Sequence, residues 1–211
     1  YGKEFKARAL IIATGASPNK LGVPGEEQFR GKGVSYCATC DGWFFKDKDV
    51  AVVGGGDSAL EEAIFLTRYA KTVTIIHRRE ELRAGALLQK RAKTNSKIKF
   101  VWNSVVEEIR GNQGVSNLLL KNVKDGGQSE LPVDGIFIFI GHSPNTQLFA
   151  NQLKMDDKNY IVADAHMNTS VPGVFAAGEV CDAFFRQVIT SAGMGAAAAI
   201  SATRFLENEG G

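Results

Sequence analysis

The sequence is poor in cysteine and histidine and has no excess of charge of either sign. Three cysteines among 211 residues are too few for the disulfide scaffold of a secreted domain. One C-x-x-C pair lacks a second pair, and the three histidines show no ligand spacing, so a structural zinc site is not expected. With 25 basic and 23 acidic side chains, the net charge of +2 lacks the basic excess typical of nucleic-acid-binding proteins.

Long apolar runs are also missing. No run approaches the roughly 18 residues that cross a membrane, and no charged-then-apolar signal peptide opens the chain. We therefore expect a cytoplasmic protein that binds neither a membrane nor nucleic acid. The composition is otherwise ordinary, with 44% hydrophobic and 23% charged residues. The exception is glycine, because 23 glycines exceed the usual share of about 7%.

The apolar pattern predicts alternating strands and helices. Continuous apolar runs at 9–13 and 135–140 are typical of strands covered on both faces, as in a parallel sheet, and a short strand is expected at 173–177. A strand at 50–53 and another at 72–76, joined by a helix, form a βαβ unit. We also expect a helix at 57–70, a loop at 18–33, a helix at 80–94, a strand at 97–102, antiparallel strands over 105–131 and a helix at 188–206.

The glycine-rich turn at 54–59, G-G-G-D-S-A, matches the dinucleotide-binding pattern G-x-G-x-x-A between a strand and a helix. Gly54 permits the tight turn, Gly56 lets a pyrophosphate approach the backbone, and Ala59 permits close packing of helix on strand. The helix N-terminus supplies N–H donors and a positive dipole end to the phosphates. The alternative is a glycine-rich turn without a ligand.

Basic residues follow the second strand of this βαβ unit. An NAD site places Asp or Glu about 20 residues beyond the turn, whereas here His77, Arg78 and Arg79 occur, with Arg83 one turn on. Cations suit a 2′-phosphate, so the pattern favours NADPH over NADH. The alternative is a set of solvated surface charges. A nucleic-acid patch is disfavoured, because interleaved aromatic residues are missing.

The C-x-x-C pair is Cys37 and Cys40, followed by Asp41. Two intervening residues allow a disulfide across the first turn of a helix, where the dipole and free N–H groups favour a reactive thiolate. Asp41 is a candidate general acid or base for thiolate chemistry. The alternative is a chance pair of buried cysteines.

A dithiol beside an NADPH site indicates a third component, because nicotinamide delivers a hydride and thiolates reduce disulfides. A flavin usually mediates between the two. Residues that could bind it follow apolar strands, at Thr14 to Gly15 and Gly178 to Glu179, where ligands of parallel sheets bind. Arg186 and Gln187 precede a helix whose N-terminus could stabilise negative charge on a reduced flavin.

Six motifs taken together resemble the low-molecular-weight, bacterial-type thioredoxin reductases. In chain order they are C-A-T-C-D-G at 37–42, G-G-G-D-S-A at 54–59, H-R-R-x-x-x-R at 77–83, G-H-S-P-N at 141–145, V-F-A-A-G-E at 174–179 and R-Q-V-I-T-S-A-G at 186–193. The resemblance covers essentially the whole chain.

The resemblance implies an α/β fold with two Rossmann-like, three-layer ββα nucleotide-binding domains of the flavoprotein disulfide reductase type. The NADPH domain, residues 21–142, is then inserted in an FAD domain formed by residues 1–20 and 143–211. Hinges are expected near 20–25 and 141–145, and a homodimer is expected.

The resemblance also assigns roles to single residues. It implies that Cys40 lies against the flavin, that Cys37 attacks the disulfide of thioredoxin, and that Asp41 is the acid-base partner. The residues expected to bind NADPH are Gly54, Gly56, Asp57, Ser58, Ala59, His77, Arg78, Arg79 and Arg83. Those expected to line FAD are Thr14, Gly15, Gly178, Glu179, Arg186, Gln187 and Val188, and Gly141 is a further cofactor contact. Cys181 has no role here beyond that of a small buried residue.

Two departures from the family accompany the resemblance. The family usually has Asp where Glu179 stands. It also carries its own G-x-G-x-x-G FAD fingerprint about a hundred residues before the dithiol, and none precedes Cys37 here. We therefore expect a longer protein whose FAD domain has a front part outside this sequence. Two alternatives are an NADPH-binding module without a stable FAD site and the flavoprotein reductase of a peroxide-reducing system.

Overall fold

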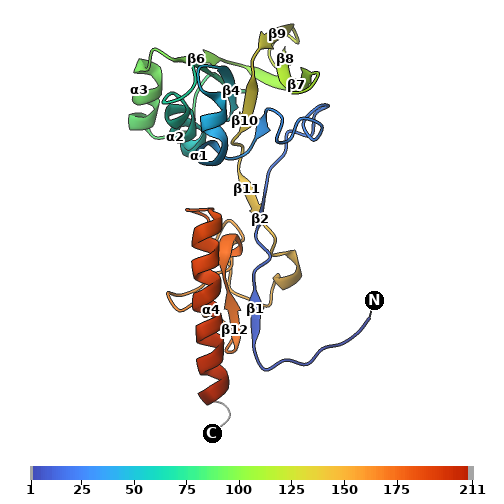
Figure 1. Ribbon diagram of the computed structural model, residues 1–211, viewed down its shortest axis with the longest axis vertical. Coiled ribbons are helices and arrows are strands. Elements are labelled where there is room, and N and C mark those ends of the chain that lie inside the picture. Colours follow the sequence, from blue (N-terminus) through green and yellow to red (C-terminus); the bar gives the residue numbers. More distant parts are fainter. Residues whose placement is uncertain (1, 209–211) are drawn as a thin grey trace. The chain divides into compact units, whose positions relative to one another are not determined.

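The computed structural model describes residues 2–208 and separates into two compact units. The first unit consists of the residues up to Ser17 together with those from His142 onward, and the second is the continuous segment Pro18–Gly141. The second unit is therefore an insertion within the first. Figure 1 labels the elements of both, which are described separately below. Among the described residues, no helix is both long and apolar enough to span a membrane.

The centre of the inserted unit is a five-stranded parallel sheet. In spatial order its strands are β3 (Val34–Ser35), β10 (Gly135–Ile138), β4 (Asp49–Val53), β5 (Thr72–Ile76) and β6 (Ile98–Val101). The three middle strands are almost wholly buried, which explains why they read as continuous apolar runs.

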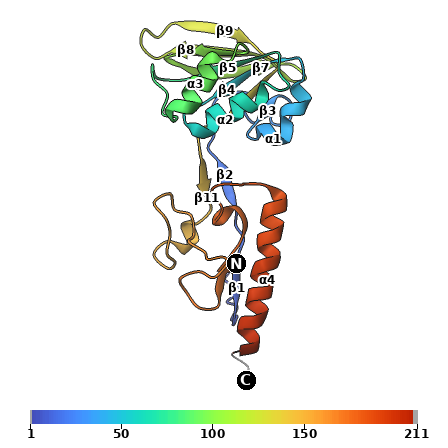
Figure 2. The same ribbon diagram turned by 90° about the vertical axis from the view of Figure 1, so that its left-hand side faces the viewer.

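This sheet is covered on both faces. Three helices lie on one face, α1 (Ala38–Asp41), α2 (Asp57–Leu66) and α3 (Ala86–Thr94), and the 3-10 helix η1 (Gly42–Phe45) continues α1. An antiparallel sheet of β7 (Ser104–Gly111), β8 (Val115–Asn122) and β9 (Gln128–Pro132) covers the other, as Figure 2 shows. Along β4, Val50 and Val52 pack on the helices, whereas Ala51 and Val53 pack under the antiparallel sheet. The predicted three-layer ββα arrangement is thus confirmed for this unit.

The first unit is built around two parallel strands and one long helix. β1 (Leu10–Ile12) pairs with β12 (Val174–Ala176), and α4 (Val188–Asn208) packs on them. Small residues of α4, Ala198 and Ala202, form a core cluster with Phe175 of β12. The unit also contains two 3-10 helices, η2 (Gln147–Phe149) and η3 (Gly178–Val180), and a small sheet of β2 (Ala16–Pro18) with β11 (His142–Pro144).

Two predicted elements are wrong in part. The strand predicted at 9–13 was expected to be covered on both faces, yet Leu10 and Ile11 are 49% and 40% exposed. Among the described residues β1 pairs with a single strand, β12, and Ile12 is buried whereas the side chains of Leu10 and Ile11 stay open. The helix predicted at 80–94 begins only at Ala86, because the preceding loop hydrogen-bonds to the glycine-rich turn instead of to itself.

Candidate functional site

The two cysteines of the C-x-x-C pair form a disulfide at the start of α1. Cys37 is the N-cap of this helix, and its Sγ accepts the backbone N–H of Cys40 at 3.2 Å. A sulfur in this position is stabilised as a thiolate once the bond is reduced. Ala38 is buried in the helix-side core, whereas Cys40 is exposed. The disulfide is therefore held by a packed helix and open to a reaction partner.

Asp41 closes α1 and lies in the same network. Its Oδ2 accepts the hydroxyl of Ser35 at 2.6 Å, and the backbone N–H of Cys37 donates to the same hydroxyl oxygen at 3.1 Å. The predicted acid-base group is thus connected through one serine to the backbone of the residue that carries the predicted nucleophile. The sequence pattern gave no sign of Ser35, since a lone serine two residues before a C-x-x-C pair has no motif.

The glycine-rich turn has the geometry that the motif requires. Gly54 has a φ of +152°, and a Cβ there would lie 2.5 Å from the carbonyl oxygen of Phe139 and 2.6 Å from the Cβ of Ala59. By contrast, a Cβ on Gly56 would meet nothing within 4 Å. Gly56 is the N-cap of α2, and Ser58 lies exposed in the first turn. The backbone at the start of α2 is consequently open to an anionic group.

The loop that carries Arg83 is tied back to this turn. The backbone N–H groups of Arg83 and Ala84 both donate to the carbonyl oxygen of Gly55, at 2.7 Å and 3.2 Å. The N–H of Gly85 donates to Oδ1 of Asp57 at 2.7 Å. Asp57, predicted as a cofactor contact, therefore also holds the arginine loop. These bonds replace the first helical turn that the sequence predicted there.

The buried side chain of His77 packs against the glycine-rich turn at Gly55. His77 is 6% exposed, and a Cβ on Gly55 would lie 2.3 Å from its Cε1 atom. Its Nε2 lies 3.0 Å from the carbonyl oxygen of Glu81. Burial lowers the pKa of His77, and the charges of nearby arginines act in the same direction. The neutral ring donates its Nε2–H to that carbonyl and braces the loop.

A cavity of about 350 Å³ opens beside these residues. It is lined by Gly54 and Gly55, by His77, and by the side chains of Arg78 and Arg83. Arg79 is exposed outside this lining. The structure therefore brings a glycine-rich turn and two of the three predicted arginines to one concave surface, an arrangement suited to a nucleotide that carries several phosphates.

The predicted flavin residues of the first unit lie at strand ends. Asn145 fixes Thr14 and Gly15, because its N–H donates to the Gly15 oxygen at 2.9 Å and its Nδ2 donates to the Thr14 oxygen at 2.8 Å. In turn, the Oγ1 hydroxyl of Thr14 donates to the backbone carbonyl oxygen of Asn145 at 2.8 Å. The G-H-S-P-N motif thus has a structural use that its spacing did not predict.

The end of β12 meets the start of α4. Gly178 has a φ of +78°, and a Cβ there would lie 3.3 Å from Ser191 of α4, so glycine permits this close approach. Glu179 is half-buried beside it, and Val188, the first residue of α4, is 88% exposed. A strand end and a helix N-terminus therefore present an open surface in this unit.

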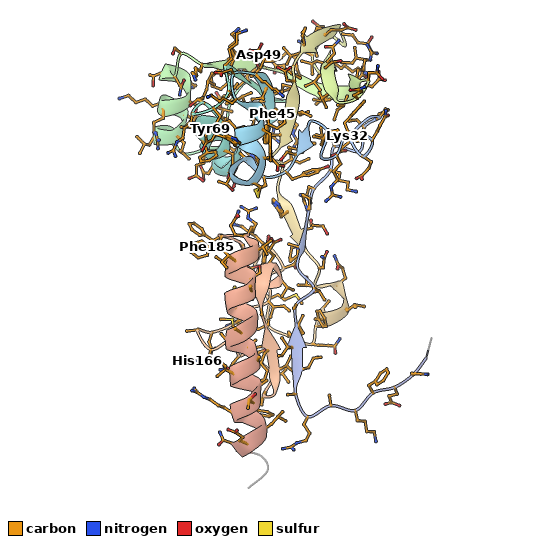
Figure 3. All side chains as sticks on the ribbon, in the orientation of Figure 1. Lys32, Phe45, Asp49, Tyr69, His166 and Phe185 are labelled. Atoms are coloured by element: carbon orange, nitrogen blue, oxygen red, sulfur yellow. A yellow bond between two sulfur atoms is a disulfide. The ribbon has the colours of Figure 1, made fainter. Side chains whose placement is uncertain are left out.

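The loop before α4 is fixed by Asp182, which sequence reasoning missed. This buried carboxylate accepts the backbone N–H groups of Phe184, Phe185 and Arg186 at 2.9, 3.0 and 3.2 Å. Figure 3 marks Phe185, whose ring packs edge-on against Phe184. An acidic residue two to four positions before its N–H partners is the signal that could have revealed this loop.

Arg186 itself has a φ of +49°, unusual for a residue with a side chain. Its Nη1 lies 2.6 Å from Nδ1 of His142 in β11. Burial, followed by the charge of Arg186, lowers the pKa of His142 to about 4. The neutral imidazole therefore accepts a hydrogen bond from the guanidinium. Gly141, the remaining predicted cofactor contact, precedes His142 with a φ of +107°, and Gln187 is half-buried beside Arg186.

Cys181 behaves as the sequence suggested. It is half-buried, and its Sγ–H points to the carbonyl oxygen of Gly178 at 3.3 Å. Burial raises the pKa of this thiol to about 11, with a further contribution from Asp182. A thiol of this kind is unreactive at neutral pH. Among the described residues, no group of His, Cys, Asp and Glu side chains forms a metal site.

Comparison with known proteins adds the following findings. Residues 1–201 match the family model described as pyridine nucleotide-disulphide oxidoreductase. Thioredoxin reductases of Streptomyces coelicolor and Listeria monocytogenes are 53% and 52% identical over 206 residues, which cover 97% of this chain. The chain spans 64% and 65% of the length of those two relatives. The crystal structure of thioredoxin reductase from Streptococcus pyogenes, 50% identical, matches 95% of this chain and 66% of its own with a TM-score of 0.90.

Proposed function

Because the chain belongs to the pyridine nucleotide-disulphide oxidoreductase family, we propose that the whole protein is an NADPH-dependent thioredoxin-disulfide reductase. The observation that carries this proposal is the disulfide of Cys37 and Cys40, held at a helix start in the same unit as the glycine-rich turn. The names of the relatives favour this function over the peroxide-reducing alternative.

The proposed reaction transfers one electron pair. NADPH and a proton become NADP⁺, and the disulfide of thioredoxin becomes two thiols. In the exchange step the thiolate of Cys37 attacks one thioredoxin sulfur and forms a mixed disulfide. The thiolate of Cys40 then attacks Cys37, which re-forms the internal disulfide and releases reduced thioredoxin. Asp41 supplies or accepts the protons that accompany these thiolate steps.

The inserted unit is the proposed NADPH domain. The open backbone at Gly56 and the N-terminus of α2 suit the pyrophosphate, with Ser58 and Ala59 in the first turn. The guanidinium groups of Arg78 and Arg83 suit the 2′-phosphate, and exposed Arg79 is a further cation beside them.

The first unit is the proposed part of the FAD domain. Its residues fit one side of a flavin site, because Gly178 brings a strand end close to α4 and the start of that helix is exposed. FAD would lie against Thr14, Gly15, Glu179, Gln187 and Val188. When bound, FAD carries the electron pair between NADPH and the disulfide. Glu179 retains the carboxylate of the family's usual Asp with one more methylene.

We also propose thioredoxin as the protein partner, a homodimer as the assembly and the cytoplasm as the location. A pair that cycles between disulfide and dithiol suits a reducing compartment.

The experiment that tests this function measures NADPH oxidation by the full-length holoprotein. We expect oxidation that depends on added thioredoxin and is accompanied by free thiols on thioredoxin, two for each NADPH consumed. NADPH oxidation of equal rate without thioredoxin, or none with it, contradicts the proposal.

A further inference from the structure

The buried hydroxyl of Ser35 contacts both the dithiol segment and its acidic neighbour Asp41. Ser35 is the second residue of β3 and is 5% exposed. Its backbone pairs with Phe137 of β10, which is fully buried in the central sheet. A side chain on a sheet position of this kind has little freedom to move.

The hydrogen bonds of Ser35 have a defined direction. Its Oγ lies 2.6 Å from Oδ2 of Asp41, 3.1 Å from the backbone nitrogen of Cys37 and 3.2 Å from the carbonyl oxygen of Cys37. A hydroxyl has a single proton, and the short distance marks the carboxylate as its acceptor. The Cys37 N–H then donates to the same oxygen. A continuous chain therefore runs from the backbone of Cys37 through Ser35 to Asp41.

Ser35 and Asp41 also line a cavity of about 470 Å³. Its wall includes Lys32 and Phe45, both labelled in Figure 3. The ring of Phe45 packs edge-on against Phe137, so this wall is part of the core. A cavity of this size holds water, which allows the carboxyl group held by Ser35 to exchange protons with solvent.

We propose that Ser35 is a positioning residue for the thiol–disulfide chemistry of Cys37 and Cys40. Its hydroxyl fixes Oδ2 of Asp41 and leaves Oδ1 available for proton exchange with the sulfurs. Because the same hydroxyl accepts the N–H of Cys37, the carboxyl group keeps its place relative to the start of α1 when the disulfide opens. The inference rests on the proposed function only in taking this pair as redox-active.

Reduction of the Cys37–Cys40 disulfide by dithiothreitol tests this proposal. When dithiothreitol reduces the disulfide, each attacking thiolate breaks one S–S bond, the displaced sulfur leaves as a thiolate, and Asp41 passes to it a proton taken up from solvent. The reductant is oxidised to its own disulfide. The rate is followed as free thiols per chain of the full-length protein, without added NADPH or thioredoxin. Failure of the proposed enzyme activity would therefore be distinguishable from failure of this inference.

Ser35→Ala should reduce the rate about tenfold at neutral pH, the usual effect of losing a hydrogen bond to a charged group. Ser35→Thr, which keeps a hydroxyl, should restore most of the rate.

Two further variants separate positioning from a general loss of structure. Thr146→Ala removes an equally buried hydroxyl in the other unit and should leave the rate unchanged. In an Asp41→Asn background, Ser35→Ala should add less than a twofold effect, because Ser35 acts through Asp41. A full tenfold loss in that background, or no loss in the single variant, would overturn the proposal.

Discussion

The backbone N–H of Gly85 donates to Oδ1 of Asp57 at 2.7 Å, and this bond fastens the arginine loop to the start of α2. Two more bonds from the same loop reach the carbonyl oxygen of Gly55. The glycine-rich turn and the loop that carries Arg83 are thus one connected structure. The proposed recognition of a 2′-phosphate by Arg83 therefore depends on Asp57, which holds the loop that carries this arginine.

Asp57→Ala should weaken the binding of NADPH about fivefold and that of NADH little, because a released loop misplaces Arg83 but not the pyrophosphate site. Asp57→Asn keeps an oxygen acceptor and should bind both cofactors nearly as wild type does. Dissociation constants from calorimetry give the comparison, with Arg83→Ala as the reference for complete loss of that cation.

Asp125→Ala is the matched control for this prediction. Its Oδ1 accepts the N–H of Gly127 in the exposed turn between β8 and β9, so the same kind of bond is lost at a distance from the cavity. Equal loss of NADPH and NADH affinity in Asp57→Ala would show that Asp57 supports the whole site and not the arginine loop.

Gly55→Ala and Gly56→Ala should have opposite consequences. A methyl group on Gly55 would overlap the buried ring of His77, so we expect the free energy of unfolding to fall by about 1–3 kcal/mol. The methyl group on Gly56 meets no protein atom and should cost little stability, but it should reduce dinucleotide affinity about tenfold or more. Thermal unfolding of both variants measures the change in stability, and titration with NADPH measures the change in affinity. Similar affinities in Gly56→Ala and wild type would remove this turn from the cofactor site.

His142 should make folding stability depend on pH. Burial and Arg186 lower its pKa to about 4, below the usual value of 6.5. As the pH falls from 6.5 towards 4, the unfolded chain binds a proton that the folded chain does not, so stability is lost over that window. The contribution is on the order of 1–2 kcal/mol after solvent screening. The free energy of unfolding, measured with denaturant at several pH values, should depend less steeply on pH in His142→Gln than in the wild type.

The exposed His166, marked in Figure 3, gives the control for this measurement. His166→Gln removes an imidazole that does not contact Arg186. The free energy of unfolding of this variant should depend on pH as that of the wild type does. If the free energy of unfolding of His142→Gln depended on pH as steeply as that of the wild type, the contact with Arg186 would not set the protonation of His142.

Much of the fold was predictable because its signals are local. The buried strands at 50–53 and 72–76 are continuous apolar runs, and the antiparallel strands over 105–131 are separated by glycine-bearing turns. The dithiol and the glycine-rich turn are short motifs whose geometry follows from their own residues.

The remaining features depend on contacts between distant segments. The helix predicted from residue 80 is replaced by a loop, because Gly55, far away in sequence, offers a better acceptor than the helix itself. Ser35, Asp182 and Asn145 are single polar residues whose partners are chosen by the fold. No periodicity or spacing in the sequence contains that information.

In the proposed reaction electrons reach thioredoxin through the Cys37–Cys40 pair, and one variant tests this route most directly. In the full-length holoprotein, Cys37→Ser should abolish thioredoxin reduction while NADPH still bleaches the flavin absorbance at the wild-type extent. Stopped-flow absorbance and a thioredoxin thiol assay on the same sample provide both readings. Thioredoxin reduction at an appreciable rate by this variant would contradict the account, because the electrons would then have another route.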